Sequence, residues 1–310
     1  MQMKVSNRQA ICDKLIELAK TDKDIVVLTS DSRGSAGLTP FADAYPDRII
    51  ETGIAEQNIV GIAAGLAKCG KKPVVASPAC FLSMRSAEQV KVDVAYSRSN
   101  VMLLGISGGI SYGALGMSHH SVQDIALMRA IPGIDVIIPA DRFESANVVE
   151  EWVHNPRPAY VRIGRNPVED VFNSEHTEYK PGKATVLRYG SEAYIIATGE
   201  TVKIALDAAS VLKKEGVSVG VINMHTLKPL DEDTVKKASD ISKIIVTIEE
   251  HSIYGGLGSA VGQIISNYRP IKVANIAIPD EPAVAGTTSE VFAHYGLTAE
   301  RIVELIKREI

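Results

Sequence analysis

A single acidic side chain, Glu56, stands in the most informative stretch of the sequence, GIAEQNIVGIAAGLA at residues 53–67. The pattern predicts a helix built from apolar and small residues, with Glu56 in its first turn. The predicted surroundings of its carboxyl group are apolar: Ile54, Ala55, Ile59 and Ile62. Burial among such side chains disfavours a charged carboxylate, so Glu56 is expected to hold a proton near neutral pH and could donate a hydrogen bond to a ligand's ring nitrogen. The alternative is a helix cap, with Gly53 at the N-cap and Glu56 at N3, the spacing of a capping box.

A second candidate is the loop GISGGISYGALGMSHH at residues 105–120, which has five glycines and two adjacent histidines. It is too rich in glycine for a helix and lacks the Gly-Lys-Ser/Thr ending of a phosphate-binding loop. Its glycines suit a close approach of the backbone to a ligand. The imidazole of His119 could shuttle a proton, or it could be a loop histidine without a role. Adjacent histidines diverge and no third ligand stands at a recognisable spacing, so no metal site is predicted.

A third candidate is the pair of arginines in YVRIGRNP at residues 160–167. The guanidinium groups of Arg162 and Arg165 could each bind a phosphate, sulfonate or carboxylate through two parallel hydrogen bonds. The alternative is that both arginines form surface salt bridges.

The elements that must position these residues form two α/β series. Continuous apolar runs alternate with helical patterns, which is typical of parallel strands covered on both faces. The first series has predicted strands at 25–29, 73–77, 101–106, 134–138 and 159–163. The second has strands at 193–197, 217–222, 243–248 and 271–276, with helices at 201–215, 232–240, 257–267 and 298–308. A polar stretch from 166 to 183, with proline and glycine, separates them.

We therefore predict an α/β protein of two domains, residues 1–183 and 184–310, each a mostly parallel sheet with helices on both faces. Ligands in such sheets bind at the carboxyl ends of the strands. This rule selects four loops of the first domain: 30–37, 51–56, 77–85 and 105–121.

Composition limits the class of protein. The 310 residues are 45% apolar and 23% charged, with a net charge of −4, as in ordinary globular domains. The lack of a basic run and an aromatic share of only 5% argue against a nucleic-acid partner. No signal peptide or membrane helix is expected, because no apolar run approaches about 18 residues. Three cysteines without a C-x-x-C spacing favour a reducing cytoplasm.

The sequence resembles the transketolase family of thiamine-diphosphate enzymes, which includes deoxyxylulose-phosphate synthase. The similar motifs follow in the family's order after GIAEQ: FLSMRSAEQ (81–89), GMSHHSVQDIALMRAIPGI (116–134), YVRIGRNP (160–167), MHTLKPLD (224–231) and EEHSIYGGLGSA (249–260). They cover nearly the whole chain. The resemblance implies a pyrimidine-binding domain followed by the family's C-terminal domain.

The resemblance also implies roles for single residues. Glu56 would contact the aminopyrimidine ring of thiamine diphosphate and promote loss of the thiazolium proton, with Phe81 stacked on the ring and Ile54 beside it. His119 would lie near the thiazolium and the substrate hydroxyls. Arg165 would bind the substrate's anionic group, with Arg162 beside it.

Three positions depart from the family pattern. Leu115 replaces an aspartate that contacts a substrate hydroxyl in the family, and Ser107 replaces a histidine that commonly helps to bind substrate. Ala87 replaces a second aromatic residue near the ring pocket. These changes place the family's usual sugar-phosphate substrates in doubt.

The chain has no Gly-Asp-Gly motif, with which the family's N-terminal domain holds diphosphate and Mg²⁺. The resemblance therefore implies the C-terminal subunit of a split transketolase, sharing thiamine diphosphate and Mg²⁺ with an N-terminal subunit, two copies of each. Its activity would be ketol transfer between anionic sugars. The alternatives are a subunit similar to deoxyxylulose-phosphate synthase or to the 2-oxoacid dehydrogenase beta chain, and a catalytically silent assembly or regulatory relative.

Overall fold

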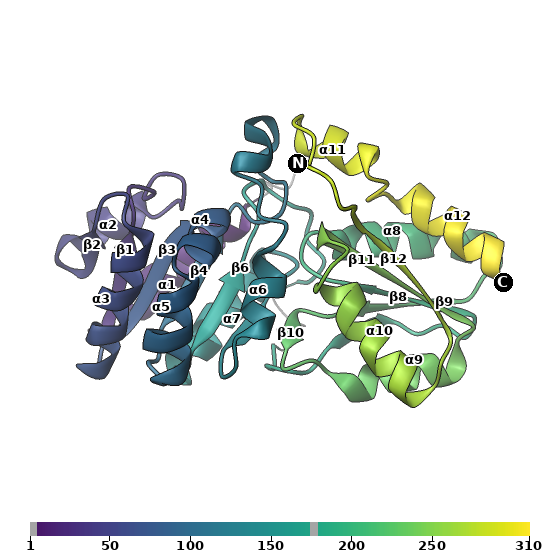
Figure 1. Ribbon diagram of the computed structural model, residues 1–310, viewed down its shortest axis with the longest axis horizontal. Coiled ribbons are helices and arrows are strands. Elements are labelled where there is room, and N and C mark those ends of the chain that lie inside the picture. The colour runs from purple at the N-terminus through teal and green to yellow at the C-terminus, as the bar shows by residue number, and fades with distance from the viewer. Residues whose placement is uncertain (1–4, 174–178) are drawn as a thin grey trace.

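A computed structural model describes residues 5–173 and 179–310 and contains two α/β units side by side (Figure 1). The first unit is built on a seven-stranded sheet in the order β10-β5-β6-β4-β3-β1-β2. Its strands are β1 (Ile25–Thr29), β2 (Ile49–Glu51), β3 (Lys72–Pro78), β4 (Met102–Ile106), β5 (Asp135–Ile137), β6 (Ala159–Arg162) and β10 (Thr226–Lys228). All neighbouring strands are parallel except β10, which is antiparallel to β5.

Helices cover both faces of this sheet because successive strand residues point to opposite sides. Leu28 and Leu103 pack toward one helical layer, and Val27 and Met102 pack toward the other. The first layer holds α3 (Glu56–Lys68), α4 (Ala79–Arg85), α5 (Ala87–Gln89), a π-helical turn (Val90–Tyr96) and α6 (Asp124–Ala130). The second holds α1 (Asn7–Leu18), α2 (Thr39–Ala44) and α7 (Arg142–His154); short 3₁₀ turns lie at Pro46–Arg48 and Gly113–Ser118.

The second unit is a five-stranded sheet in the order β12-β11-β8-β9-β7. Four strands are parallel: β8 (Ala193–Ala197), β9 (Val219–Asn223), β11 (Ile244–Ser252) and β12 (Lys272–Ile278). The edge strand β7 (Thr185–Arg188) is antiparallel to β9. One face packs on α8 (Thr201–Lys214), α11 (Thr288–His294) and α12 (Ala299–Glu309), and the other on α9 (Glu232–Ile241) and α10 (Leu257–Tyr268).

The predicted fold class is confirmed: both sheets are mostly parallel, with helices on both faces. Each strand and helix predicted from the apolar pattern is present, with ends that differ by a few residues at most. The sequence did not predict β7, β10 and α11, because elements of three to seven residues carry little periodic signal. The prediction of a loop at 77–85 is wrong: this segment is the end of β3 followed by the short helix α4.

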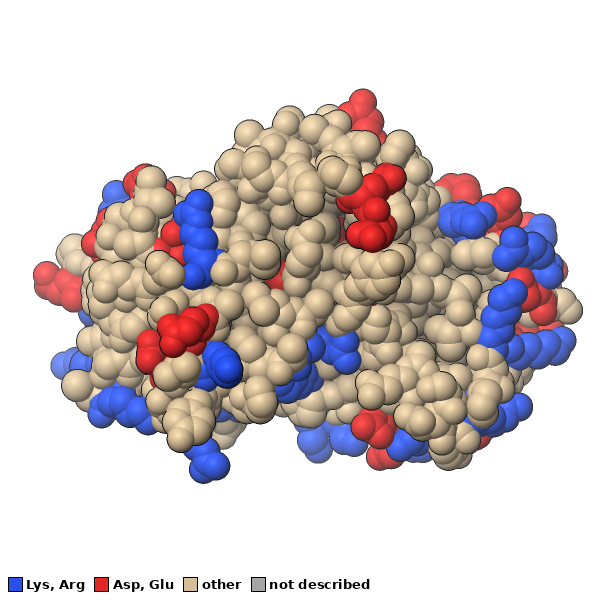
Figure 2. All heavy atoms as spheres, in the orientation of Figure 1, with Lys and Arg blue, Asp and Glu red and all other residues tan. Residues whose placement is uncertain are grey.

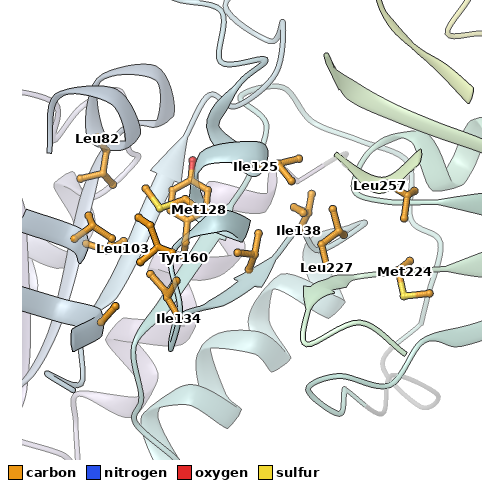
Figure 3. Close-up of a cluster of buried hydrophobic side chains, with 14 of the residues drawn as sticks. Leu82, Leu103, Ile125, Met128, Ile134, Ile138, Tyr160, Met224, Leu227 and Leu257 are labelled. Atoms are coloured by element: carbon orange, nitrogen blue, oxygen red, sulfur yellow. The ribbon is translucent and has the colours of Figure 1, made fainter. Parts of the chain in front are cut away.

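One of the three hydrophobic core clusters continues from the first unit into the second. Figure 3 follows this core from Leu82 and Leu103 in the first unit, through Ile138 and Leu227, to Leu257 in the second. Strand β10 contributes to the junction because it belongs to the second series by sequence but pairs with β5 of the first sheet. The two units are therefore joined by packing and by backbone hydrogen bonds as well as by the connecting chain.

Part of the segment predicted as a polar linker is hydrogen-bonded to the first unit. Asp141 caps α7 and also accepts hydrogen bonds, each of 2.7 Å, from the backbone amides of Val171 and Phe172. Residues 174–178 of the predicted linker lie outside the described residues. Within residues 5–173 and 179–310, no helix has the length and apolar character needed to cross a membrane.

Candidate active site

Glu51 organises the turn that brings Glu56 to the edge of the sheet. Its carboxylate accepts hydrogen bonds from Thr29 Oγ1 (2.5 Å), from the amide of Asp31 (2.6 Å) and from the amide of Gly53 (3.1 Å). Burial would raise the pKa of Glu51, but these three hydrogen bonds together lower it below the ordinary value. Gly53 has a φ of 70°, a backbone conformation that glycine adopts at low cost. Sequence reasoning did not identify this role of Glu51.

The capping-box alternative for Glu56 is wrong. Helix α3 has Ala55 as its N-cap, so Glu56 is the first helical residue, and no side chain caps the helix. The side chain of Glu56 is only 4% exposed, and its Oε2 accepts a hydrogen bond of 3.0 Å from Nη1 of Arg85. The predicted apolar wall is only partly correct: Ile59 is buried, but Ile54 is 73% exposed.

Arg85 also covers Phe81. The guanidinium carbon lies 4.2 Å from the centre of the Phe81 ring, one turn earlier on α4. A flat group with N–H donors therefore contacts both the carboxyl group of Glu56 and the aromatic ring. Glu56 and Phe81, which sequence reasoning assigned to one ligand, are brought together by the fold.

His119 lies next to Phe81, as the sequence led us to expect of one site. Its ring meets the rings of Phe81 and Tyr112 edge-on, with centroid distances of 5.2 and 5.3 Å. The Oγ of Ser118 lies 2.9 Å from Nδ1 of His119. The adjacent His120 is buried, and its Nε2 lies 3.0 Å from the carbonyl oxygen of Gly113. Only His119 of this pair therefore contributes to the cluster around Phe81.

Arg165 continues the cluster beyond Tyr112. Its guanidinium carbon lies 5.2 Å from the centre of the Tyr112 ring. Its Nη1 is buried and has no hydrogen-bond partner among the described residues. A buried guanidinium nitrogen without an acceptor is costly, so this donor suits an anionic ligand.

Arg8 on α1 is a second cation at this end of the cluster, and sequence reasoning missed it. Burial, followed by the positive charge of Arg165, lowers the pKa of Arg8, which reflects the proximity of the two guanidinium groups. Its Nη1 donates a hydrogen bond of 2.7 Å to the carbonyl oxygen of Ser35. A bridge between Ser6 and Pro167 joins the start of α1 to the segment after β6. This juxtaposition depends on the tertiary fold, so no local sequence signal indicated it.

Arg162 lies in a different environment, buried at the junction of the two units. Its Nη2 donates a hydrogen bond of 2.7 Å to the carbonyl oxygen of Glu250, and its Nε lies 3.4 Å from Oδ2 of Asp124. A Cβ atom built on Gly108 would lie 2.3 Å from Arg162, and one on Gly109 would lie 2.1 Å from Glu250. The sequence predicted that the glycines of this loop let the backbone approach a ligand. At Gly108 and Gly109 the backbone instead approaches the buried side chains of Arg162 and Glu250.

The residues that depart from the family pattern lie in contrasting environments. Ser107, at the carboxyl end of β4, is buried with a φ of 55°, and its Oγ lacks a hydrogen-bond partner in the part of the chain that the structure describes. Leu115 is 52% exposed, and Ala87 is half-buried. In residues 5–173 and 179–310, no three His, Cys, Asp or Glu side chains form a group that could hold a metal ion.

Comparison with known proteins assigns the chain to a family. The chain matches the pyrimidine-binding domain of transketolase over residues 3–169 and the transketolase C-terminal domain over residues 182–302. It therefore belongs to the transketolase family, whose pyrimidine-binding domain implies thiamine diphosphate as the cofactor.

Its relatives include single subunits of split transketolases. The chain is 46% identical over 308 residues to one subunit of the apulose-4-phosphate transketolase of Phocaeicola vulgatus, with 98% of each chain covered. It is 36% identical over 296 residues to the 6-deoxy-6-sulfo-D-fructose transketolase subunit SqwH of Clostridium sp. (strain MSTE9), covering 96% of this chain and 92% of the relative. A solved structure described as "Split gene transketolase, inactive beta4 tetramer" superposes with a TM-score of 0.91 at 35% identity, over 98% of each chain.

Proposed function

We propose that this chain is the C-terminal subunit of a two-subunit transketolase that uses thiamine diphosphate to transfer a ketol unit between anionic sugars. The observation that supports this proposal is a continuous cluster of side chains at the edge of the first sheet where its parallel strands have their carboxyl ends. A buried carboxyl group and an aromatic ring lie at one end, and two neighbouring guanidinium groups lie at the other. An imidazole stands between them.

The first end fits the aminopyrimidine half of the cofactor. Glu56 and Phe81 already accommodate the flat, N–H-bearing guanidinium of Arg85, so the same surfaces suit a flat ring with nitrogen atoms at its edge. Glu56 would hold a proton at the ring nitrogen, and Phe81 would cover the ring face, with Ile54 at the outer side. Thiamine diphosphate, when bound, supplies the carbon nucleophile for ketol transfer. We assign its diphosphate and Mg²⁺ mainly to the partner subunit.

The middle and the second end would act on the sugar. Ser118 orients His119 through Nδ1, which leaves Nε2 to exchange a proton with a substrate hydroxyl. Arg165 and Arg8 would bind the terminal anion, because the guanidinium fork fits phosphate or sulfonate equally well. We assign the unpartnered Oγ of Ser107 to the substrate. Arg162 is engaged at the junction, so Arg165 would carry most of the substrate's charge.

The surroundings of the site support a partner subunit. Four exposed apolar side chains stand in the three segments that carry Glu56, Arg85 and His119: Ile54, Met84, Leu115 and Met117. Figure 2 shows a largely uncharged area around and above α6 in the middle of this view, while acidic and basic side chains lie over α5. Exposed apolar groups of this kind mark protein interfaces. We propose that an N-terminal transketolase subunit covers the site and that the assembly contains two copies of each chain.

Reconstitution with the N-terminal subunit tests the proposal. The chain alone should be inactive, and the pair should transfer a ketol unit from phosphate- or sulfonate-bearing sugars but poorly from uncharged analogues. Decarboxylation of pyruvate without ketol transfer would favour the alternative similar to deoxyxylulose-phosphate synthase or the 2-oxoacid dehydrogenase beta chain. Full cofactor binding by the pair without either reaction would favour the catalytically silent relative.

A further inference from the structure

One side chain, Arg85, contacts both groups that the proposed function assigns to the cofactor's aminopyrimidine ring. Its Nη1 lies 3.0 Å from Oε2 of Glu56, and its guanidinium carbon lies 4.2 Å from the centre of the Phe81 ring. The guanidinium is flat, carries N–H donors and lies over an aromatic face, so it makes the two kinds of contact that a bound aminopyrimidine would make.

The two partners of this ion pair differ in exposure. The side chain of Glu56 is 4% exposed, whereas that of Arg85 is 47% exposed. Arg85 is the last residue of α4, and the next residue, Ser86, has φ −107° and ψ 20°, outside the helical range. The guanidinium can therefore move into solvent without opening the hydrophobic core, while Glu56 stays in place on α3.

We propose that Arg85 occupies the aminopyrimidine site while the cofactor is absent, and that it must leave Glu56 and Phe81 before the ring can bind. This inference rests on the proposed function of Glu56 and Phe81. A buried carboxylate without a cation or hydrogen-bond donor is unfavourable, and Arg85 supplies both in the chain alone. The chain then binds the ring only in the fraction of molecules from which Arg85 has withdrawn, which lowers its apparent affinity.

Binding of the isolated ring tests this directly, without the partner subunit and without catalysis. The probe is the hydroxymethyl-aminopyrimidine that forms one half of thiamine, titrated into the full chain and followed by ligand-observed NMR. Replacing the guanidinium by an apolar side chain of similar length, Arg85→Met, should tighten binding by about 10-fold. Arg85→Lys keeps the charge but loses the flat fork, so it should lie between the wild type and Arg85→Met.

Two controls define the site. Arg308→Met removes an exposed arginine at the far end of α12 and should bind the probe as the wild type does. The double variant Arg85→Met/Glu56→Gln should not show the tighter binding of Arg85→Met, because the carboxyl group that contacts the ring would be absent. Weaker binding in Arg85→Met would make Arg85 a direct ligand of the ring and overturn the proposal. Equal binding, or undetectable binding in both chains, would overturn it as well.

A second titration separates this inference from the proposed function. Thiamine diphosphate with Mg²⁺ is added to the chain assembled with its N-terminal partner. Binding that is weakened by Glu56→Gln, together with no gain in the probe experiment, would remove only the role of Arg85. No binding by the assembled wild type would remove the proposed function itself.

Discussion

Two contacts between an arginine and carboxylates, one at the junction and one in the candidate site, differ in how they are enclosed. At the junction, Arg162 lies between Asp124 and Glu250, and all three side chains are nearly inaccessible to solvent. In the site, the buried Glu56 pairs with the half-exposed Arg85. The junction cluster is also held by backbone hydrogen bonds, since Glu250 accepts from the amide of Ile110 at 2.6 Å. The first contact is therefore enclosed by protein on all sides, whereas the second has its arginine at the solvent.

Removing the arginine of each contact should give the largest difference between them. Arg162→Met leaves the carboxyl groups of Asp124 and Glu250 buried without their cation and should reduce the free energy of unfolding by about 3–5 kcal/mol. Arg85→Met should reduce it by about 1 kcal/mol, because Arg85 is half-exposed and the N-terminus of α3 also stabilises Glu56. Urea denaturation of both variants measures the difference. Similar losses would mean that the two contacts do not differ as described.

The anion-binding end should give the next largest effect. Arg165→Ala removes a charged hydrogen-bond donor and should lower kcat/KM for an anionic sugar by roughly 10- to 150-fold. Arg8→Ala should cost less, about 10-fold, because the guanidinium of Arg8 is already engaged by Ser35. Steady-state kinetics with a charged sugar and an uncharged analogue measure both. If Arg165→Ala impaired the two substrates equally, Arg165 would be structural.

The most gradual expected effect is a pH dependence that arises at the junction. Glu200 is the N-cap residue of α8. Burial is the first cause of the raised pKa values of Glu200 and Glu250, and the charge of Glu250 adds to it at Glu200. The folded chain therefore holds a proton that the unfolded chain has released. The resulting stability is fully present below the ordinary glutamate pKa and is lost as pH rises through the raised values.

We accordingly expect the free energy of unfolding to fall between about pH 5 and pH 7, by about 1 kcal/mol per pH unit for each proton that the folded chain retains. Glu200→Gln removes one titrating group and should flatten this fall. Part of the fall should remain, because burial also raises the pKa of Glu144, to about 8. Urea titrations at several pH values measure the slope. A wild-type stability that rises with pH over this range would contradict the assignment.

Sequence reasoning predicted the parts of the fold that depend on local periodicity. The continuous apolar strands, such as Ile25–Thr29, and the long amphipathic helices, such as Ala299–Glu309, are where they were expected. The parts that depend on tertiary pairing were missed. Strand β10 pairs with a sheet formed by a distant part of the chain, and its three residues carry no pattern of their own.

The candidate site divides in the same way. Glu56, Phe81, His119 and Arg165 could be named because each stands in a motif that resembles the transketolase family. The strand-end rule alone selected the loops of the first three but not that of Arg165. Arg8 and Arg85 could not be assigned from the sequence, because their roles come from neighbours on other elements. Arg162 and Arg165 stand three residues apart in one motif, yet only the fold separates the buried Arg162, which pairs with carboxylates at the junction, from Arg165, which lies beside Tyr112.

We propose that Glu56, the first residue of α3, acts on the cofactor as an acid and does not serve the helix alone. Hydrogen–deuterium exchange at the thiazolium carbon, measured in the chain assembled with its N-terminal partner, tests this most directly. Glu56→Gln keeps the size of the side chain and should preserve the fold. We expect the exchange rate to fall by roughly 10²- to 10⁴-fold, the usual contribution of a general acid–base group. An exchange rate equal to that of the wild type would contradict the account.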